Sequence, residues 1–188
     1  MTVEQRGILN LHNGIRDDIN NRRIPGQPQP KSLGKYVWDS ELQQTAAGYA
    51  KTCNTDVNTA KQLYNNKYGI NIANGNDFKS AFDEWFKRSH YYNFEKNLCN
   101  LQDCSSYKQI VSDRTTHIGC SLSMCPGEKG SSEMTVCFYY PPADANGQPY
   151  KIDQRQMYAN ISLRSATPVI RPEATSYRLA QGRCRCRC

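Results

Sequence analysis

The sequence lacks long apolar runs and has few histidines, and each shortage narrows the functions open to it. Nowhere in its 188 residues does an apolar stretch approach the roughly 20 residues of a membrane-spanning helix. The opening stretch, MTVEQRGILNLHNG, has no apolar run long enough for a signal peptide. The 3 histidines form no Ser–His–Asp or Cys–His arrangement at a recognisable spacing. We therefore expect no transmembrane segment and no enzymatic activity.

Apolar residues are also scarce, at 38% of the chain, which predicts a modest core reinforced by covalent links. Nine cysteines in so short a chain are typical of proteins that fold in an oxidising compartment. The sequon Asn160-Ile161-Ser162 makes Asn160 a candidate for glycosylation. We therefore expect a secreted, extracellular protein whose signal peptide has been removed. The cysteines are Cys53, Cys99, Cys104, Cys120, Cys125, Cys137, Cys184, Cys186 and Cys188.

Basic residues gather toward the C-terminus. The formal net charge is +7, and in residues 150–188 eight Lys or Arg oppose only Asp153 and Glu173. Residues 1–149 are therefore close to neutral. Because nucleic-acid-binding domains present a basic face, we expect no nucleic-acid partner.

Two segments are expected, a domain over residues 1–150 and a basic extension over residues 151–188 whose apolar residues follow no period. The extension ends in RCRCRC, which contains Cys184, Cys186 and Cys188. Because the total of nine is odd, at least one thiol has no partner within a monomer. The three can pair between chains in a disulfide-linked or loose dimer, leave a reactive thiol or bind a soft metal.

The spacing of apolar residues predicts helices first and strands later. Residues 3–21, the stretch YVWDSELQQTAAGYAKTC with Asp39 as N-cap, and residues 77–90 fit amphipathic helices. Residues 118–124 and 134–140 alternate between apolar and other side chains, and PGEKGSSE joins them as an antiparallel hairpin. Because no βαβ alternation occurs, we expect an α+β domain with helices packed on an antiparallel sheet.

The polar stretch NLCNLQDCSSYKQIVSDRTTHIGC holds three cysteines at none of the common zinc or redox spacings. One interpretation is a zinc site, in which the C-x4-C pairs Cys99/Cys104 and Cys120/Cys125 supply four thiolates. The other is a disulfide that holds a loop beside a binding site. The spacing alone leaves both interpretations open.

Residues 5–150 resemble the CAP superfamily of cysteine-rich secretory, antigen 5 and pathogenesis-related proteins, most of all the venom allergen-like proteins of parasitic helminths. ILNLHNGIR, VWDSELQQTAAGYAKTC and AFDEWFKRSHYYNF are similar to the family's helices, and IGCSLSMC and VCFYYPP to its strands. The resemblance implies an α-β-α sandwich around a short antiparallel sheet. It also implies three disulfides, which are Cys53–Cys125, Cys99–Cys104 and Cys120–Cys137.

The resemblance implies a cavity in which two His and two Glu can hold a divalent metal, but the four aligned positions differ here. They hold Val57, Ile70 of GINI, Arg88 of WFKR and Ser106 of CSSYKQ. Valine and isoleucine offer no lone pair, serine is a poor ligand, and arginine repels a cation. We therefore expect no metal or other cofactor, and binding rather than catalysis.

Two lipid sites follow from the resemblance. Sterols bind family members through a loop with the pattern Φ-x-Φ-x4-Φ, and YNFEKNLC supplies Tyr92 and Phe94, with Leu98 next to the third position, Cys99. Packing of this loop against the domain explains the same aromatics. A fatty-acid groove is implied between two helices, although helix packing explains its residues equally well. The groove residues are Ile8, Leu11, Ile15, Ile110 and Val111.

A second class of function remains open, a secreted host-interaction or immunomodulatory protein that acts through protein–protein contacts. Twelve tyrosines and a basic extension suit such surfaces. Among the histidines, we expect His12 to form hydrogen bonds within the core, and His90 and His117 to lie at the surface or in packing positions.

Overall fold

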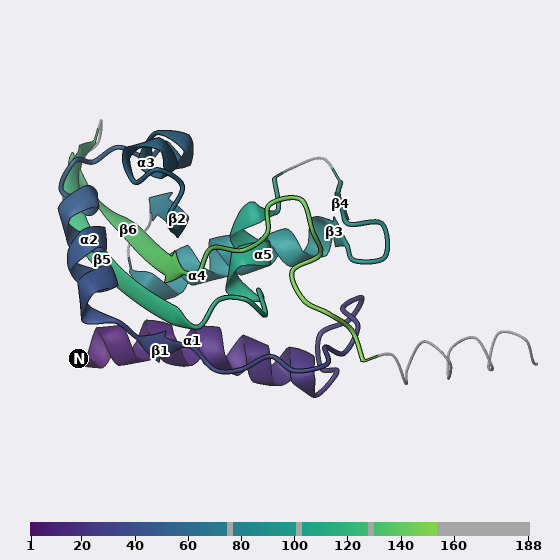
Figure 1. The fold of residues 1–188 in the computed structure, drawn as a ribbon. Helices are drawn as coiled ribbons and strands as arrows, with labels where there is room; N and C mark the ends of the chain where they lie inside the picture. The colour runs from purple at the N-terminus through teal and green to yellow at the C-terminus, as the bar shows by residue number, and fades with distance from the viewer. Residues whose placement is uncertain (75–76, 101–102, 128–129, 154–188) are drawn as a thin grey trace, which may run out of the picture. The chain divides into compact units, whose positions relative to one another are not determined.

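The structure is a computed structural model that describes residues 1–153, except 75–76, 101–102 and 128–129 (Figure 1). No helix among these residues is long and apolar enough to cross a membrane. Residues 154–188 of the predicted extension, with Asn160 and the cysteines of RCRCRC, lie outside the described residues. The elements are α1 (Val3–Asn20), β1 (Val37–Trp38), α2 (Ser40–Ala50), α3 (Val57–Leu63), β2 (Gly69–Asn74), α4 (Phe78–Lys87), the 3-10 helix η1 (Arg88–Tyr91), β3 (Tyr92–Asn93), β4 (Leu98–Cys99), α5 (Ser105–Ile110), β5 (His117–Gly127) and β6 (Gly130–Tyr140).

Helix α1 begins at a capping box, in which the Thr2 side chain accepts from the amide of Gln5 and the Gln5 side chain accepts from the amide of Thr2. Its buried residues recur every three or four positions and form one face, as the apolar spacing predicts. These residues are Ile8, His12, Arg16 and Ile19. The helix expected over residues 3–21 is confirmed.

Aspartates cap two more of the predicted helices. Asp39 accepts from two backbone amides at the start of α2, and Asp77 accepts from the amide of Ser80 at the start of α4. Helix α2 ends at Ala50, short of the expected Cys53. Helix α4 gives way to the 3-10 turn η1, which covers the end of the range expected for the third helix.

The main sheet has the strand order β1-β5-β6-β2. The predicted hairpin is confirmed, since β5 and β6 pair antiparallel with Cys120 opposite Cys137. Strand β2 adds antiparallel to the other edge of β6. The two-residue strand β1 lies at the remaining edge of β5 and pairs parallel with it, with Val37 beside His117.

Helices cover both faces of this sheet, which gives the expected α-β-α sandwich (Figure 1). Along β6, Cys137 and Tyr139 join the cluster that includes α1, α4 and α5, while Val136 and Phe138 join the cluster of α2 and α3. Helix α2 lies very close to β5, because a Cβ added at Gly119 would fall 2.2 Å from the backbone nitrogen of Gln43.

Candidate functional site

The four positions at which the resemblance predicts metal ligands border one cavity. Val57 begins α3, Ile70 lies in β2, Arg88 follows α4, and Ser106 lies in the first turn of α5. Together they line a cavity of about 160 Å³. The fold therefore gathers four residues that come from four different elements.

Two carboxylates that the sequence analysis did not single out line the same cavity, Glu84 and Asp103. A Glu84 oxygen lies 3.9 Å from Nη2 of Arg88, one helical turn away. Asp103 accepts from the amide of Ser105 at 2.9 Å and from its hydroxyl. The i,i+4 spacing of Glu84 and Arg88 is a signal that could have identified this pair. The acids are thus engaged with neighbouring side chains.

The donor set of this cavity does not fit a divalent metal. Val57 and Ile70 offer no ligand atom, and the guanidinium of Arg88 brings a positive charge. Among the described residues, no three or more His, Cys, Asp or Glu side chains gather in a group that could hold a metal ion. That the protein binds no metal stays a prediction.

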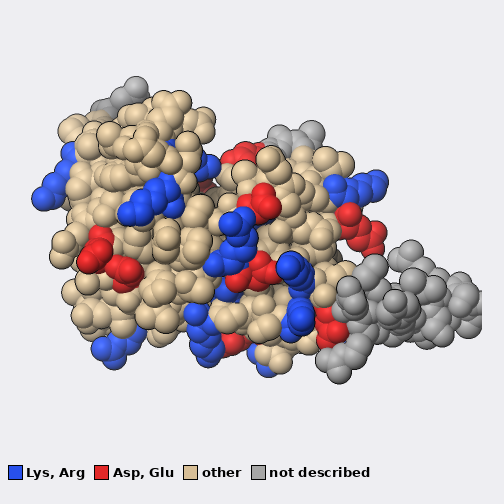
Figure 2. Space-filling model, in the orientation of Figure 1, with Lys and Arg blue, Asp and Glu red and all other residues tan. Residues whose placement is uncertain are grey.

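A second cavity, of about 350 Å³, shares Ile70 and Asp103 with the first and extends toward Lys61 and Lys108. Nζ of Lys108 donates to the carbonyl of Ala145 at 2.9 Å, and partial burial lowers the pKa of its ammonium group. Basic and acidic side chains interleave on the face in Figure 2 rather than forming a patch of one sign. The cleft itself is of mixed charge, because Asp103 and Asp144 line it together with the two lysines.

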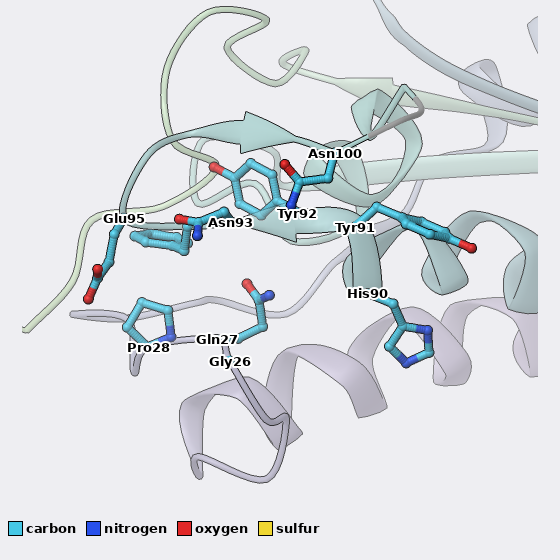
Figure 3. Close-up of a pocket in the computed structure, with 10 residues that line it drawn as sticks. Gly26, Gln27, Pro28, His90, Tyr91, Tyr92, Asn93, Glu95 and Asn100 are labelled. Carbon is cyan, nitrogen blue, oxygen red and sulfur yellow. The ribbon is translucent and has the colours of Figure 1, made fainter.

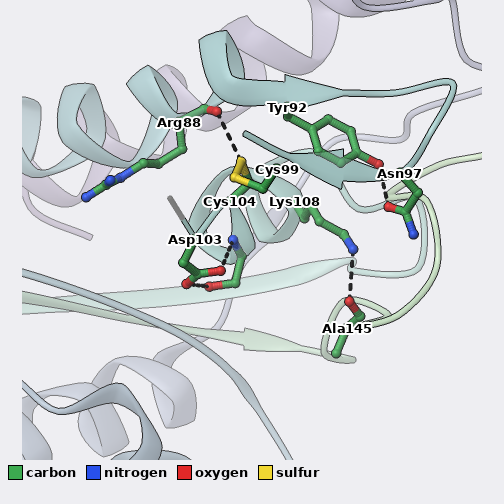
Figure 4. Close-up of a disulfide and its surroundings, with 9 residues drawn as sticks. Arg88, Tyr92, Asn97, Cys99, Asp103, Cys104, Lys108 and Ala145 are labelled. Carbon is green, nitrogen blue, oxygen red and sulfur yellow. Dashed lines mark hydrogen bonds between the residues drawn. A yellow bond between two sulfur atoms is a disulfide. The ribbon is translucent and has the colours of Figure 1, made fainter. Parts of the chain in front are cut away.

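The disulfide Cys99–Cys104 joins β4 to the start of α5, with Cα atoms 5.8 Å apart (Figure 4). The Sγ atom of Cys104 lies 3.5 Å from the carbonyl oxygen of Arg88. On the far side of the loop, the hydroxyl of Tyr92 donates to Oδ1 of Asn97 at 2.8 Å. The disulfide therefore fixes the β3–β4 hairpin beside the cavity that contains Arg88.

The other two pairings implied by the resemblance are also present. Cys53–Cys125 ties the segment after α2 to β5, and Cys120–Cys137 links β5 to β6. The zinc interpretation is wrong, because all four cysteines that it requires take part in these three disulfides.

The aromatic loop residues are largely buried. Tyr92 is 6% exposed and Phe94 is 4% exposed, whereas Leu98 is 54% exposed. The Tyr92 ring lies 5.8 Å from the ring of Tyr107, and the Phe94 ring lies 4.6 Å from that of Tyr150. Burial raises the pKa of Tyr92 to about 12. Most of the surface of both rings is thus used in packing.

Both rings nevertheless border a cavity of about 510 Å³ between the β3–β4 hairpin and the loop that contains Gln27 and Pro28 (Figure 3). The two sides are held together by a third segment. Nε2 of Gln148 donates to the carbonyl of Phe94 at 2.8 Å, and the hydroxyl of Tyr150 donates to that of Pro28 at 2.9 Å. We call this space, lined by residues 26–28, 90–95 and Asn100, the hairpin pocket.

The five positions of the expected fatty-acid groove separate into two groups. Ile8, Ile110 and Val111 are fully buried in the core, and Leu11 and Ile15 are partly buried. Ile8 and Leu11 also border a cavity of about 420 Å³. The further residues that line it are Glu4, Gly7, Asp77, Phe78, Lys79, Leu122 and Glu133.

Of the three histidines, His90 borders one of these cavities, and His12 and His117 lie apart from them. His12 is fully buried, as expected, with Nδ1 2.8 Å from the carbonyl oxygen of Ile8. Its burial lowers its pKa to about 3. His117 is partly buried with Nδ1 2.8 Å from the hydroxyl of Thr116, and exposed His90 borders the hairpin pocket.

Known proteins resemble this chain in both sequence and structure. It is 32% identical to mouse GLIPR1-like protein 1 over 154 residues, which cover 76% of this chain and 62% of the mouse protein. It is 38% identical to the STS14 protein of Solanum tuberosum over 150 residues, which cover 76% and 64% of the two chains. The chain thus spans less than two thirds of either relative.

The structure of venom allergen-like protein 4 from Schistosoma mansoni superposes with a TM-score of 0.72 at 35% identity, over 84% of this chain and 99% of that one. A sequence family described as the cysteine-rich secretory protein family, CAP, matches residues 9–139. The chain belongs to the CAP, or cysteine-rich secretory protein, family.

Proposed function

We propose that this chain is a secreted, non-enzymatic lipid-binding protein whose preferred ligand is a sterol held in the hairpin pocket. The observation that carries the proposal is the size of this pocket, about 510 Å³, beside the rings of Tyr92 and Phe94. Small-molecule sites commonly span about 300–1,000 Å³ and combine apolar walls with a few polar groups. Burying a flat apolar ligand there contributes about 25 cal/mol per Å² of apolar area.

The rigidity of the aromatic wall supports this proposal. Tyr92 and Phe94 pack on Tyr107 and Tyr150, and the Cys99–Cys104 disulfide fixes the hairpin that carries them. A preformed wall loses little conformational entropy when a ligand binds. The ligand would meet the ring edges that remain accessible, because the rest of each ring is packed.

Binding without chemistry is the function that the remaining side chains favour. The cavity at the predicted metal positions offers Val57, Ile70 and Arg88 in place of metal ligands. His12, the buried histidine, forms its hydrogen bonds within the core, away from these cavities. A general acid or base needs to reach the bound substrate, and His12 is too deeply buried to do so.

A fatty acid is the less favoured lipid. The cavity beside Ile8 and Leu11 has a rim with the carboxylates Glu4, Asp77 and Glu133. Its one lysine, Lys79, forms an ion pair with Asp83, one helical turn away. An ionised fatty acid would bring a further negative charge to this rim, which like-charge repulsion disfavours. An uncharged sterol carries no such penalty.

The proposal is tested by titrating the full chain with a fluorescent sterol. Asn100→Trp places a bulky ring at an exposed position that borders the pocket, so we expect it to abolish saturable binding without changing the circular dichroism spectrum. Asn10→Trp, at an exposed position on α1, should bind like wild type. The double variant Tyr92→Ala/Phe94→Ala should lose both binding and stability, because its rings serve both.

Three outcomes would count against the proposal. Absence of saturable binding by the wild type would favour the alternative, a secreted protein that acts through protein–protein contacts. Equal binding by wild type and Asn100→Trp would place the lipid elsewhere. Conversion of the bound sterol to a different compound would contradict the non-enzymatic part.

A further inference from the structure

The side chain of Gln27 occupies an unusual position on one side of the hairpin pocket. It is 8% exposed, and its Oε1 atom has no hydrogen-bond partner among the described residues. Figure 3 shows the amide of Gln27 pointing from its loop toward the β3–β4 hairpin, on the side where Asn100 reaches down. A buried acceptor thus faces the space in which the sterol is proposed to bind.

An unpaired buried acceptor is costly for a protein. More than about 90% of buried polar groups have a hydrogen-bond partner, because an unpaired group loses its bonds to water without replacement. Such a group at a pocket is satisfied when a ligand brings a donor. The ligand that suits Oε1 therefore carries an O–H or N–H group.

One donor that lines the pocket is engaged elsewhere. The hydroxyl of Tyr92 donates to Asn97, on the hairpin itself. Asn93, which also lines the pocket, accepts from the amide of Lys96. Both bonds stabilise the hairpin turn, and donating the Tyr92 hydroxyl to Gln27 instead would break the first of them.

We propose that Oε1 of Gln27 accepts the hydroxyl hydrogen of the bound sterol and makes the site selective for free sterols. The inference rests on the proposed function and adds the residue that determines specificity. The apolar ring system lies against the edges of Tyr92 and Phe94, and the single hydroxyl reaches the loop on the opposite side. Esters and ketones of the same ring system bring only acceptors, which leave Oε1 unpaired.

The strength of this selection follows from the geometry of the site. A site built to bond a ligand hydroxyl discriminates strongly against an analogue that lacks it, because the buried partner is then left unsatisfied. Here Oε1 has no partner in the ligand-free chain either. Binding an analogue without the hydroxyl therefore breaks no existing hydrogen bond, and the analogue lacks only the bond that a free sterol gains. We therefore expect a preference of about tenfold rather than several thousandfold.

The test compares cholesterol with cholestenone, its ketone, and with cholesteryl acetate, in competition with a fluorescent sterol on the full chain. Wild type should bind cholesterol about tenfold more tightly than either analogue. Gln27→Leu, which keeps the approximate size but removes the acceptor, should reduce that preference to less than about threefold while retaining its affinity for cholestenone. Gln44→Leu, at an exposed position on α2, should keep the wild-type preference.

A second measurement separates recognition from a structural role. Removing an unpaired buried acceptor should leave the melting temperature of Gln27→Leu equal to or above that of the wild type. A fall of several degrees would mean that Gln27 has a partner within the protein, and would overturn the inference.

The remaining outcomes are distinct. Loss of all saturable sterol binding in the wild type would overturn the proposed function and this inference together. Sterol binding with equal affinity for the ketone, or a preference that survives in Gln27→Leu, would overturn only the role of Gln27.

Discussion

His12 and Tyr139 meet in the core although 127 residues separate them in the sequence. Nε2 of the imidazole lies 2.9 Å from the tyrosine hydroxyl, and Nδ1 lies 2.8 Å from the carbonyl of Ile8. Both contacts are satisfied when Nδ1 donates and Nε2 accepts from the hydroxyl, which in turn accepts from the side chain of Asn71 at 3.2 Å. This arrangement requires a neutral imidazole, and it links α1 to β6 and β2.

The neutral imidazole predicts a loss of stability in acid. Burial lowers the pKa of His12 from 6.5 to about 3, so the unfolded chain binds a proton between these values while the folded chain does not. The free energy of unfolding should therefore fall as the pH drops below about 6.5, by roughly 2–3 kcal/mol between pH 7 and pH 4.5. Urea unfolding at a series of pH values, followed by circular dichroism, measures this change.

A His12→Gln variant supplies the comparison, because glutamine does not titrate. Its free energy of unfolding should depend less on pH over this interval than that of the wild type, even though its stability at pH 7 is lower. A nuclear magnetic resonance titration of the wild-type imidazole provides a check that needs no variant. An imidazole that gains a proton near pH 6.5 in the folded protein would contradict the prediction.

Arg16 should contribute strongly to the stability of the fold although it is charged. Its side chain is fully buried, and its guanidinium donates to carbonyl groups that include those of Ser112 and Thr115. It also lies 4.2 Å from the ring centre of Tyr36. We expect Arg16→Met to lower the free energy of unfolding by about 3 kcal/mol or more, because buried carbonyls lose their donors.

The matched control is Arg23→Met. Arg23 is exposed and its partner Asp18 is a surface carboxylate, so this change should cost less than about 1 kcal/mol. Denaturant unfolding of both variants gives the comparison. Similar losses in the two variants would contradict the role assigned to Arg16.

The disulfides should contribute unequally to stability. Cys53–Cys125 closes a separation of 72 residues, whereas Cys99–Cys104 closes one of 5. On the loop-entropy account, the first stabilises the fold by about 4 kcal/mol and the second by about 2 kcal/mol. Denaturant unfolding of Cys53→Ala/Cys125→Ala and Cys99→Ala/Cys104→Ala should show this order. Peptide mapping without reduction should also recover all three links, and a reversed order of stability would argue against the entropy account.

The cavity lined by Val57, Ile70, Arg88 and Ser106 should bind no stoichiometric zinc. To exclude binding by the C-terminal cysteines, elemental analysis uses the full chain with Cys184, Cys186 and Cys188 replaced by Ser. We expect well under one zinc ion per chain. One tightly bound ion per chain that is lost on substitution at these four cavity positions would contradict the prediction.

Rebuilding the predicted metal ligands gives the positive control. Val57→His, Ile70→Glu, Arg88→Glu and Ser106→His together place four ligating side chains around the same cavity. This combined variant should bind one divalent ion per chain by elemental analysis. Failure of the folded variant to bind would mean that the four positions do not converge closely enough for coordination.

Much of the fold could be predicted from the sequence because its signals are local. The apolar spacing of α1, the caps Asp39 and Asp77 and the alternation in the β5–β6 hairpin each depend on a short stretch of residues. Strand β2 was missed because its alternation is limited to Ile70 and Ile72 on either side of Asn71, which is too short a pattern to identify a strand. Strand β1 has only two residues, too few for any pattern.

The candidate site could be predicted only in part. The family resemblance identified the hairpin aromatics, but their burial depends on Tyr107 and Tyr150, which come from distant segments. Gln27 lies within a proline-rich segment, where a glutamine is normally solvated. Its importance emerges only when the fold places it across a cavity from a hairpin more than 60 residues later in the sequence.

Two residues outside the hairpin pocket connect its two sides. Gln148 bonds to Phe94 on one side and Tyr150 bonds to Pro28 on the other, yet neither borders the cavity. Among the described residues, no disulfide joins the two sides directly. This short stretch at the end of the domain therefore connects them through hydrogen bonds. Release of these bonds would free both sides at once, so exchange of the proposed ligand would depend on residues that do not line its pocket.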